Sequence, residues 1–266
     1  MSDRQSTVRP DGILGSVLVT GSPRYVPRGQ WSPLYAVIVT FVITFAAVVA
    51  GAVVAYIILP ALVGSSPSDF AEQHEHIAGL VALTFVVAAI LVLTWLAAGL
   101  LGDRPREVLQ LDAPLPAAVD VIAAIAGYTL LYSALVTIRY ALDPTALIAE
   151  YNKDNEYYLA ALRETYWPVV ILLLLGIVVG GETLFEGFLL SGFAKLRWGF
   201  WGMAVTTGAA LSAATATTVA GAVQELVIVL YAYWLTWRSG RIWLAIICEL
   251  WGSALLFVIL AAVAWT

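Results

Sequence analysis

Residues 180–190 read GGETLFEGFLL, and they lie inside one long apolar run, Trp167–Phe193. The stretch places two glutamates, Glu182 and Glu186, where a helix that crosses a bilayer would ordinarily have no acid. A charged side chain at the centre of such a helix costs on the order of 2.5–3.5 kcal/mol on insertion scales, so an acid kept there is a functional suspect. The run therefore predicts a membrane helix and a candidate site within it.

The composition of the whole chain agrees with a membrane protein. Of its 266 residues, 61% are hydrophobic and only 12% are charged, whereas soluble domains carry about 25% charged residues. The net charge of −5 provides no basic surface for nucleic acid, so we expect no nucleic-acid partner. The single cysteine, Cys248, can form no disulfide within the chain.

A helix needs roughly 20 apolar residues to cross a bilayer, and seven segments meet that requirement. We therefore expect an all-α fold, a polytopic bundle of seven transmembrane helices. The boundary near Thr218 separates two segments that almost touch in sequence, which predicts a tight helical hairpin. The predicted spans are Tyr35–Leu59, Ile77–Leu101, Ala117–Leu142, Trp167–Phe193, Phe200–Thr217, Val219–Trp237 and Ile242–Trp265.

We expect one membrane domain and no second domain. A polar tail over 1–33 precedes a single transmembrane domain over 34–266. Within that domain, 34–142 supplies three N-terminal helices and 167–266 supplies a four-helix core. No internal repeat is visible in the sequence.

Lysine and arginine favour the cytoplasmic side of a membrane, so their placement predicts the orientation. Seven spans put ten of the 13 basic residues on one side and three on the other, where most of the loop acids also fall. The N-terminus is therefore predicted inside and the C-terminus outside. The ten are Arg4, Arg9, Arg24, Arg28, Arg104, Arg106, Lys195, Arg197, Arg238 and Arg241, and the three are Arg139, Lys153 and Arg163.

Two smaller patterns predict how the helices are anchored and packed. Gly176 and Gly180 are four residues apart, a spacing of small residues that lets two membrane helices approach closely. Tryptophans gather at the predicted inner boundary, where indole rings anchor a protein in the headgroup region. They are Trp31, Trp198, Trp201, Trp237 and Trp243.

Two outer connections contain residues of interest. Residues 65–79, SSPSDFAEQHEHIAG, form an acidic loop that holds both histidines, His74 and His76. Two ligands on a loop are a weak metal signal, so we expect solvated histidines and no confident metal site. Residues 143–168 alternate apolar, tyrosine and charged positions, which predicts an amphipathic helix at the membrane surface.

Four glutamates fall within the predicted spans: Glu182, Glu186, Glu225 and Glu249. Each residue of a helix rises about 1.5 Å, so the distance in sequence from a basic loop gives the depth. Glu186 and Glu249 come out at nearly one level, and Glu182 and Glu225 share a deeper one. Glu182 and Glu186 are spaced i, i+4 and share a helix face.

No Lys, Arg or His lies at these depths in the predicted spans. Unpaired carboxylates in a medium of low dielectric take up protons. We therefore expect neutral, hydrogen-bonded carboxylic acids, or else a wet cavity or a bound cation. A purely structural role, in which the acids bond to backbone and hydroxyl groups nearby, is equally compatible with the pattern.

The stretch GETLFEGFLLSGFAKLRWG, 181–199, resembles the first motif of the CPBP family of intramembrane metalloproteases (CAAX-processing and bacteriocin-processing, also Abi), which reads Glu-Glu-x-x-x-Arg-Gly. RIWLAIICELWGSALLF, 241–257, resembles the third motif, His-x-x-x-Asn. LSAAT, 211–215, falls where the second motif, Phe-x-x-x-His, is expected. The resemblance runs in order and spacing from Trp167 to Phe257.

The chemistry that this family implies does not carry over residue by residue. In the family, a glutamate and histidines are thought to activate water for peptide hydrolysis. Here the second glutamate of the first motif is kept and the other functional positions differ in residue type. The equivalent positions are Gly181 for the first glutamate, Glu182 for the second, Glu186 for the arginine, Thr215 and Glu249 for the two histidines, and Ser253 for the asparagine.

The favoured hypothesis is a protease-like membrane protein without catalytic activity, an accessory, scaffold or assembly subunit of the bacterial inner membrane. It would bind lipids and another integral membrane protein or complex, and no cofactor is expected. One alternative is an intramembrane peptidase with a rewired glutamate site. A second is a proton or cation pathway through Glu182, Glu225 and Glu249, although the inverted repeats typical of transporters are missing from the sequence.

Overall fold

The computed structural model describes residues 25–29, 31–100, 104–112, 116–154, 156–163, 167–216 and 218–265, apart from a few side chains within the helices. These residues form helices and connecting turns, and no strand occurs among them. The elements are α2 (Pro33–Val53), η1 (Val54–Ile58), α3 (Leu59–Val63), α4 (Pro67–Gln73), α5 (Glu75–Leu100), α6 (Pro105–Val108), α7 (Ala118–Leu142), α8 (Pro144–Asp154), α9 (Glu156–Arg163), α10 (Trp167–Glu182), η2 (Thr183–Leu189), α11 (Leu190–Phe193), α12 (Gly199–Thr215), α13 (Val219–Ser239) and α14 (Trp243–Trp265).

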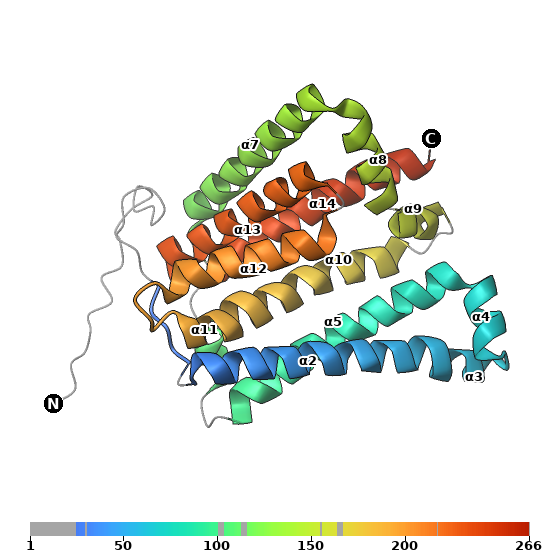
Figure 1. Ribbon diagram of the computed structural model, residues 1–266, viewed down its shortest axis with the longest axis horizontal. Helices are drawn as coiled ribbons and strands as arrows, with labels where there is room; N and C mark the ends of the chain where they lie inside the picture. The colour runs from blue at the N-terminus through green and yellow to red at the C-terminus, as the bar shows by residue number, and fades with distance from the viewer. Residues whose placement is uncertain are drawn as a thin grey trace.

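The long helices run back and forth along one direction. In Figure 1, α2, α7, α12 and α14 run one way, and α5, α10 and α13 run the other. The connections at one end are 104–112, 194–198 and 240–242, which we name the arginine-rich end. The opposite end is formed by α4, α8 and α9.

Within the described residues, six helical runs are long and apolar enough to cross a membrane. The run at α12 has 17 residues, about 25 Å of helix, which is less than the roughly 30 Å of a bilayer's hydrocarbon core. The count of seven spans therefore stays a prediction. The six runs are Pro33–Val63, Ile77–Leu100, Ala118–Leu142, Trp167–Phe193, Val219–Ser239 and Trp243–Ala261.

Helix ends follow local capping chemistry. The Ser32 hydroxyl accepts a hydrogen bond from the Tyr35 amide, 3.2 Å away, and Pro33 stands at the first helical position of α2. Thr218 caps α13 in the same way, accepting from the Gly221 amide at 3.0 Å. The predicted boundary near Thr218 is thus confirmed, because α12 ends at Thr215 and α13 begins at Val219.

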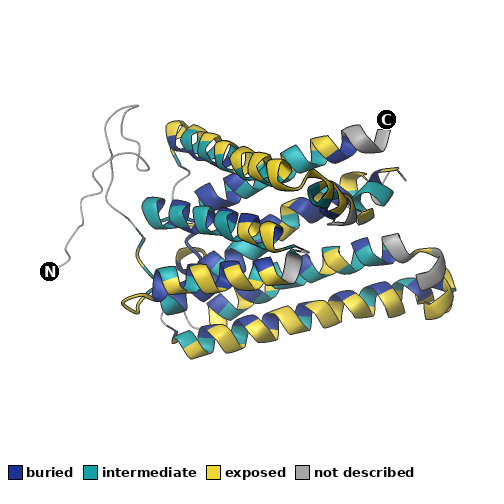
Figure 2. Ribbon diagram, turned by 45° about the horizontal axis from the view of Figure 1, so that its top comes forward, coloured by how far each residue is buried: buried dark blue, intermediate teal, exposed yellow. Residues whose placement is uncertain are grey.

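The core of the bundle lies around α10 and α13, as Figure 2 shows by the buried residues that face inward. In the most apolar stretch of the runs that contain α10 and α13, 39% of the residues are buried, against 11% in α7. Gly176 of α10 lies against Val87 of α5 so closely that an added Cβ would come within 2.6 Å of the valine side chain. This contact confirms the close approach expected from the paired glycines.

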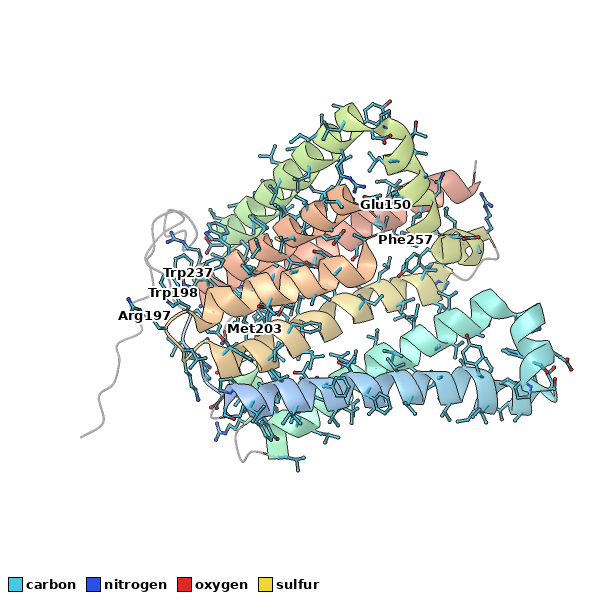
Figure 3. The ribbon with its side chains drawn as sticks, in the orientation of Figure 1. Glu150, Arg197, Trp198, Met203, Trp237 and Phe257 are labelled. Atoms are coloured by element: carbon cyan, nitrogen blue, oxygen red, sulfur yellow. The ribbon has the colours of Figure 1, made fainter. Side chains whose placement is uncertain are left out.

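Trp31 differs from the expectation of an interface anchor. Its side chain is only 5% exposed and stacks on Phe188 of η2, with the ring centroids 4.5 Å apart. Its indole N–H donates to the Phe188 carbonyl at 3.2 Å. Trp198, by contrast, is 74% exposed at the arginine-rich end, as an anchor would be (Figure 3).

The outer connections also contain more helix than expected. Residues 65–79, expected as a loop, include α4 and the start of α5. Residues 143–168, expected as one amphipathic helix, include both α8 and α9, and Leu162 of α9 is buried against the bundle. This connection packs into the bundle in addition to covering its end.

Gly51 marks a close approach of α2 to α5. A Cβ at this position would stand 2.6 Å from the Ala82 carbonyl oxygen, which is backbone and cannot move aside. We expect Gly51→Ala to lower the free energy of unfolding by about 1–3 kcal/mol, the usual cost of overpacking. Gly202→Ala is the control, because nothing lies within 4 Å of its Cβ position. Denaturation in mixed micelles measures both, and equal effects would contradict the assignment of a tight contact at Gly51.

Candidate functional site

The predicted acidic stretch lies on an irregular part of its helix. After Glu182 the α-helix widens into the π-helical segment η2, Thr183–Leu189, and returns to α-helix at Leu190. Short π segments inside α-helices occur frequently at functional sites, because they re-aim side chains. Here the segment buries Glu186, which is 1% exposed.

Three of the four predicted acids come together. The charged groups that act on Glu182 are Glu186, one turn along the same run, and Glu249 of α14. Glu249 also acts on Glu186. Glu182, Glu186 and Glu249 therefore form one acidic cluster, with two acids from the junction of α10 and η2 and one from α14, and like charges repel within it.

Glu225 lies outside this acidic cluster. Its side chain is exposed on α13, although it is near enough to Glu249 to act on it electrostatically. The sequence placed Glu225 at the depth of Glu182, but depth alone does not say which way a helix face turns. Of the predicted group of four buried acids, Glu186 is buried, Glu182 and Glu249 are half-buried, and Glu225 is exposed.

The acidic cluster is only partly satisfied by hydrogen bonds. The Thr236 hydroxyl of α13 donates to Oε2 of Glu186. Oε1 of Glu186 and Oε2 of Glu182 are buried without a hydrogen-bond partner among the described residues. Burying an acceptor or a charge without a partner costs free energy, so the acidic cluster lowers the stability of the fold.

Several polar residues that the sequence did not single out surround the acidic cluster. Tyr233 of α13 is 2% exposed and lies near Glu186 and Glu182. Tyr25 lies near Glu186 from the N-terminal segment, and burial raises the pKa of its phenol well above the ordinary value, so that it stays a neutral donor. No sequence signal marks either tyrosine, because each reaches the cluster only through tertiary packing.

Gln110 is the most unusual of these neighbours. It is 1% exposed, it lies near Tyr25, and it has a positive φ of 58°, the one such non-glycine residue among those described. Neither atom of its amide group has a hydrogen-bond partner in the described part of the chain. The loop 104–112 is pressed against η2, since a Cβ on Gly187 would stand 3.3 Å from the Leu109 carbonyl oxygen.

An ion pair fastens the N-terminal segment to the loop 104–112. One guanidinium nitrogen of Arg28 lies 2.8 Å from both carboxylate oxygens of Asp112. The Tyr25 amide also donates to the Trp237 carbonyl at 3.3 Å. Residues 25–29 and 104–112 therefore close the arginine-rich end of the bundle over the acidic cluster.

The remaining positions of the family motifs hold no acid or base. Gly181 is half-buried on α10, with nothing within 4 Å of its Cβ position. Thr215 is the last residue of α12, and its side chain lies outside the described part of the structure. Ser253 is half-buried on α14, one turn after Glu249.

The one histidine side chain that the structure describes, that of His74, does not lie near the acidic cluster. His74 is exposed beside Phe70, between α4 and α5 at the opposite end of the bundle, and the side chain of His76 lies outside the described residues. No three His, Cys, Asp or Glu side chains among those described stand close enough to hold a metal ion. Catalytic zinc sites are typically built on histidine ligands, so the carboxyl groups present do not fit the metal that the family resemblance implies.

A second polar cluster, which the sequence did not reveal, lies at the opposite end. Arg139 of α7 is paired with Glu150 of α8, and the two side chains are 12% and 7% exposed (Figure 3). Arg139 also donates to Oε1 of Gln224 at 2.9 Å, and the Thr218 hydroxyl donates to Oε2 of Glu150 at 2.7 Å. The pair therefore ties α7 and α8 to the beginning of α13.

Comparison with known proteins agrees with the motif resemblance. Residues 163–253, roughly a third of the chain, match the model of the family described as Type II CAAX prenyl endopeptidase Rce1-like. The match spans all three motif positions and confirms the resemblance to the CPBP family over this segment. No curated protein and no solved structure matches the chain.

Proposed function

We propose that this Rce1-like membrane protein is a non-catalytic accessory or assembly subunit that binds a partner integral membrane protein through its acidic cluster. The observation that carries the proposal is that Glu182, Glu186 and Glu249 lie near one another and that the charged groups that act on them are other carboxyls. A site of this kind attracts a cation. A basic residue in a partner's membrane helix has the complementary charge.

Peptide hydrolysis is disfavoured by the residue types at the site. A general base must reach the water that it activates, and it works with a second group that handles the proton on the leaving nitrogen. Glu186 is buried and bonded to Thr236, and no imidazole occurs around it in the described residues. Threonine and glutamate at positions 215 and 249 replace the two histidines of the family motifs.

Partner binding would relieve the energetic cost of the acidic cluster. A buried carboxyl group without a counter-charge either stays protonated or carries a poorly solvated negative charge. A cation placed among the carboxyls stabilises the charged form. Intramembrane acids and bases typically pair with one another for this reason. The protein alone would keep the acids neutral, and the complex would ionise at least one of them.

The proposal includes seven spans with the N-terminus inside, in the bacterial inner membrane. The alternating run of the long helices supports this topology, since it gathers the loops with Arg104, Lys195, Arg197 and Arg241 at one end. In this arrangement α12 crosses the bilayer beside α13, on which it packs. Cysteine labelling of the loops from either side of the membrane tests it.

We expect a specific partner to co-purify with the full chain in mild detergent and to be lost when the acids are neutralised. The Glu182→Gln, Glu249→Gln double variant removes two acids of the cluster, and a pull-down with mass identification measures the retained partner. A loss on the order of tenfold corresponds to a single ion pair worth about 1.4 kcal/mol. Glu225→Gln is the control, since it removes an exposed membrane glutamate.

Three outcomes decide against the proposal. Purified protein that runs alone and monodisperse from its native membrane would leave no partner to explain. Hydrolysis of a membrane-embedded peptide by the wild-type protein, abolished by Glu182→Gln, would show a peptidase with a rewired site. Retention of the same partner by the double variant would also exclude the acidic cluster as its binding site.

A further inference from the structure

The seam between α5 and α14 is closed at one end and open at the other. Both helices pack on α10, which forms the floor of the seam. Near the opposite end, α9 fills the seam, because Leu162 is buried there between Leu80 of α5 and Leu260 of α14. Phe257 of α14 packs against the same group beside α9 (Figure 3).

At the arginine-rich half of the seam no helix among the described residues takes the place of α9. A cavity of about 440 Å³ lies there, and its walls are almost wholly apolar. Val92 and Leu96 of α5 are 57% and 53% exposed, so this side of the cavity faces outward, where the hydrocarbon of the bilayer lies. The walls come from α5, α10 and α14, with Leu91, Trp95, Val179, Trp243 and Ile246 among them.

The size and walls of the cavity suit one long hydrocarbon chain. An apolar cavity of about 150 Å³ holds one benzene molecule, which has six carbons. A cavity of about 440 Å³ therefore has room for roughly 18 carbons. Water gains no hydrogen bonds from such walls, and interiors do not keep large voids. A membrane lipid is the molecule that supplies such a chain from the side on which the cavity opens.

The rim of the cavity favours an anionic headgroup. Leu111, which lines the cavity, donates its amide to the Arg106 carbonyl at 2.8 Å, and Arg241 stands two residues before the lining Trp243. The two acids of this rim, Glu107 and Asp112, are each paired with a further arginine. Arg106 is exposed at this rim and forms no ion pair among the described residues, and basic pockets beside membrane helices bind anionic lipid headgroups.

We propose that this cavity is a binding site for one anionic phospholipid, whose acyl chain lies between α5 and α14 and whose phosphate lies at the rim with Arg106. The lipid completes the seam at the arginine-rich half as α9 completes it at the other half. The site does not use the acidic cluster, so it stands independently of the proposed accessory function. It would hold its lipid in the wild-type protein with or without a partner.

Native mass spectrometry of the full chain from nanodiscs of equal phosphatidylglycerol and phosphatidylcholine tests this site. We expect one phosphatidylglycerol to remain bound after most other lipids are removed. Val179→Trp fills the cavity and is expected to lower this retention at least tenfold. Leu172→Trp is the matched control on the lipid-facing side of the same helix, 63% exposed and outside the cavity lining, and is expected to retain the lipid.

The headgroup is tested by Arg106→Gln, because Arg106 is exposed and its side chain is not part of the bundle core. We expect the preference for phosphatidylglycerol over phosphatidylcholine to fall roughly fivefold, the usual contribution of one arginine near an anionic lipid surface. Equal retention of the two lipids by the wild-type protein would overturn the proposal. Unchanged retention of phosphatidylglycerol by Val179→Trp would also overturn it. The same holds if this variant loses a co-purifying protein while its bound lipid is unchanged.

Discussion

Arg139→Met is expected to lower the free energy of unfolding by about 3–5 kcal/mol. The guanidinium of Arg139 is paired with Glu150 and bonded to Gln224, and both charged side chains are nearly buried. Removing one partner leaves the other charge without compensation, and that penalty exceeds the attraction lost. Reversible unfolding in mixed micelles, followed by circular dichroism, gives the value.

Two comparisons separate this effect from a general loss of charge. Arg104→Met removes an arginine from an exposed pair with Glu107, and it should change stability by less than about 1 kcal/mol. The double variant Arg139→Met, Glu150→Leu removes both buried charges and should recover much of the stability. Similar losses for Arg104→Met and Arg139→Met would show that the Arg139–Glu150 pair is open to solvent.

The second large effect is expected for Trp31→Ala, at about 3–5 kcal/mol. The indole fills the space between the start of α2 and the segment η2, with Phe188 stacked on it and Gly192 close to its ring. Alanine would leave a cavity there and remove the hydrogen bond to the Phe188 carbonyl. The same unfolding assay measures the loss.

Trp198→Ala is the control for this substitution. Trp198 lies at the same end of the bundle and is 74% exposed, so its removal should cost little stability in micelles (Figure 3). A Trp31→Ala variant that unfolds like wild type would refute the buried packing of this indole. Because Trp31 packs on the segment that carries Glu186, the variant also tests whether η2 depends on the beginning of α2.

The long helices could be predicted from sequence because the signal is local. Twenty apolar residues in a row leave few alternatives in a bilayer, and the run Trp167–Phe193 has the same limits in the sequence and in the structure. The boundary at Thr218 was also predictable, because a threonine cap and a helix start are neighbours in sequence. The π-helical form of Thr183–Leu189 was not, since it depends on what packs around it.

The candidate site was predicted in part. Glu182, Glu186 and Glu249 stood out because acids in apolar runs are rare, and the motif resemblance related their positions. Gln110 and Tyr25 carry no such signal, since glutamine in a loop and tyrosine in a tail are ordinary. Only the folding of the loop 104–112 and of residues 25–29 over the end of the bundle brings them to the acidic cluster.

The amino-acid sequence alone predicts an apolar helical protein with acids inside its membrane spans and no histidine in those spans. Composition and periodicity suffice for that, because each residue either fits a bilayer or does not. Only the tertiary structure decided that Glu225 lies outside, that Trp31 is buried, and that Arg139 meets Glu150. Those outcomes depend on how each helix is rotated and on what packs against it, which residues distant in the chain determine together.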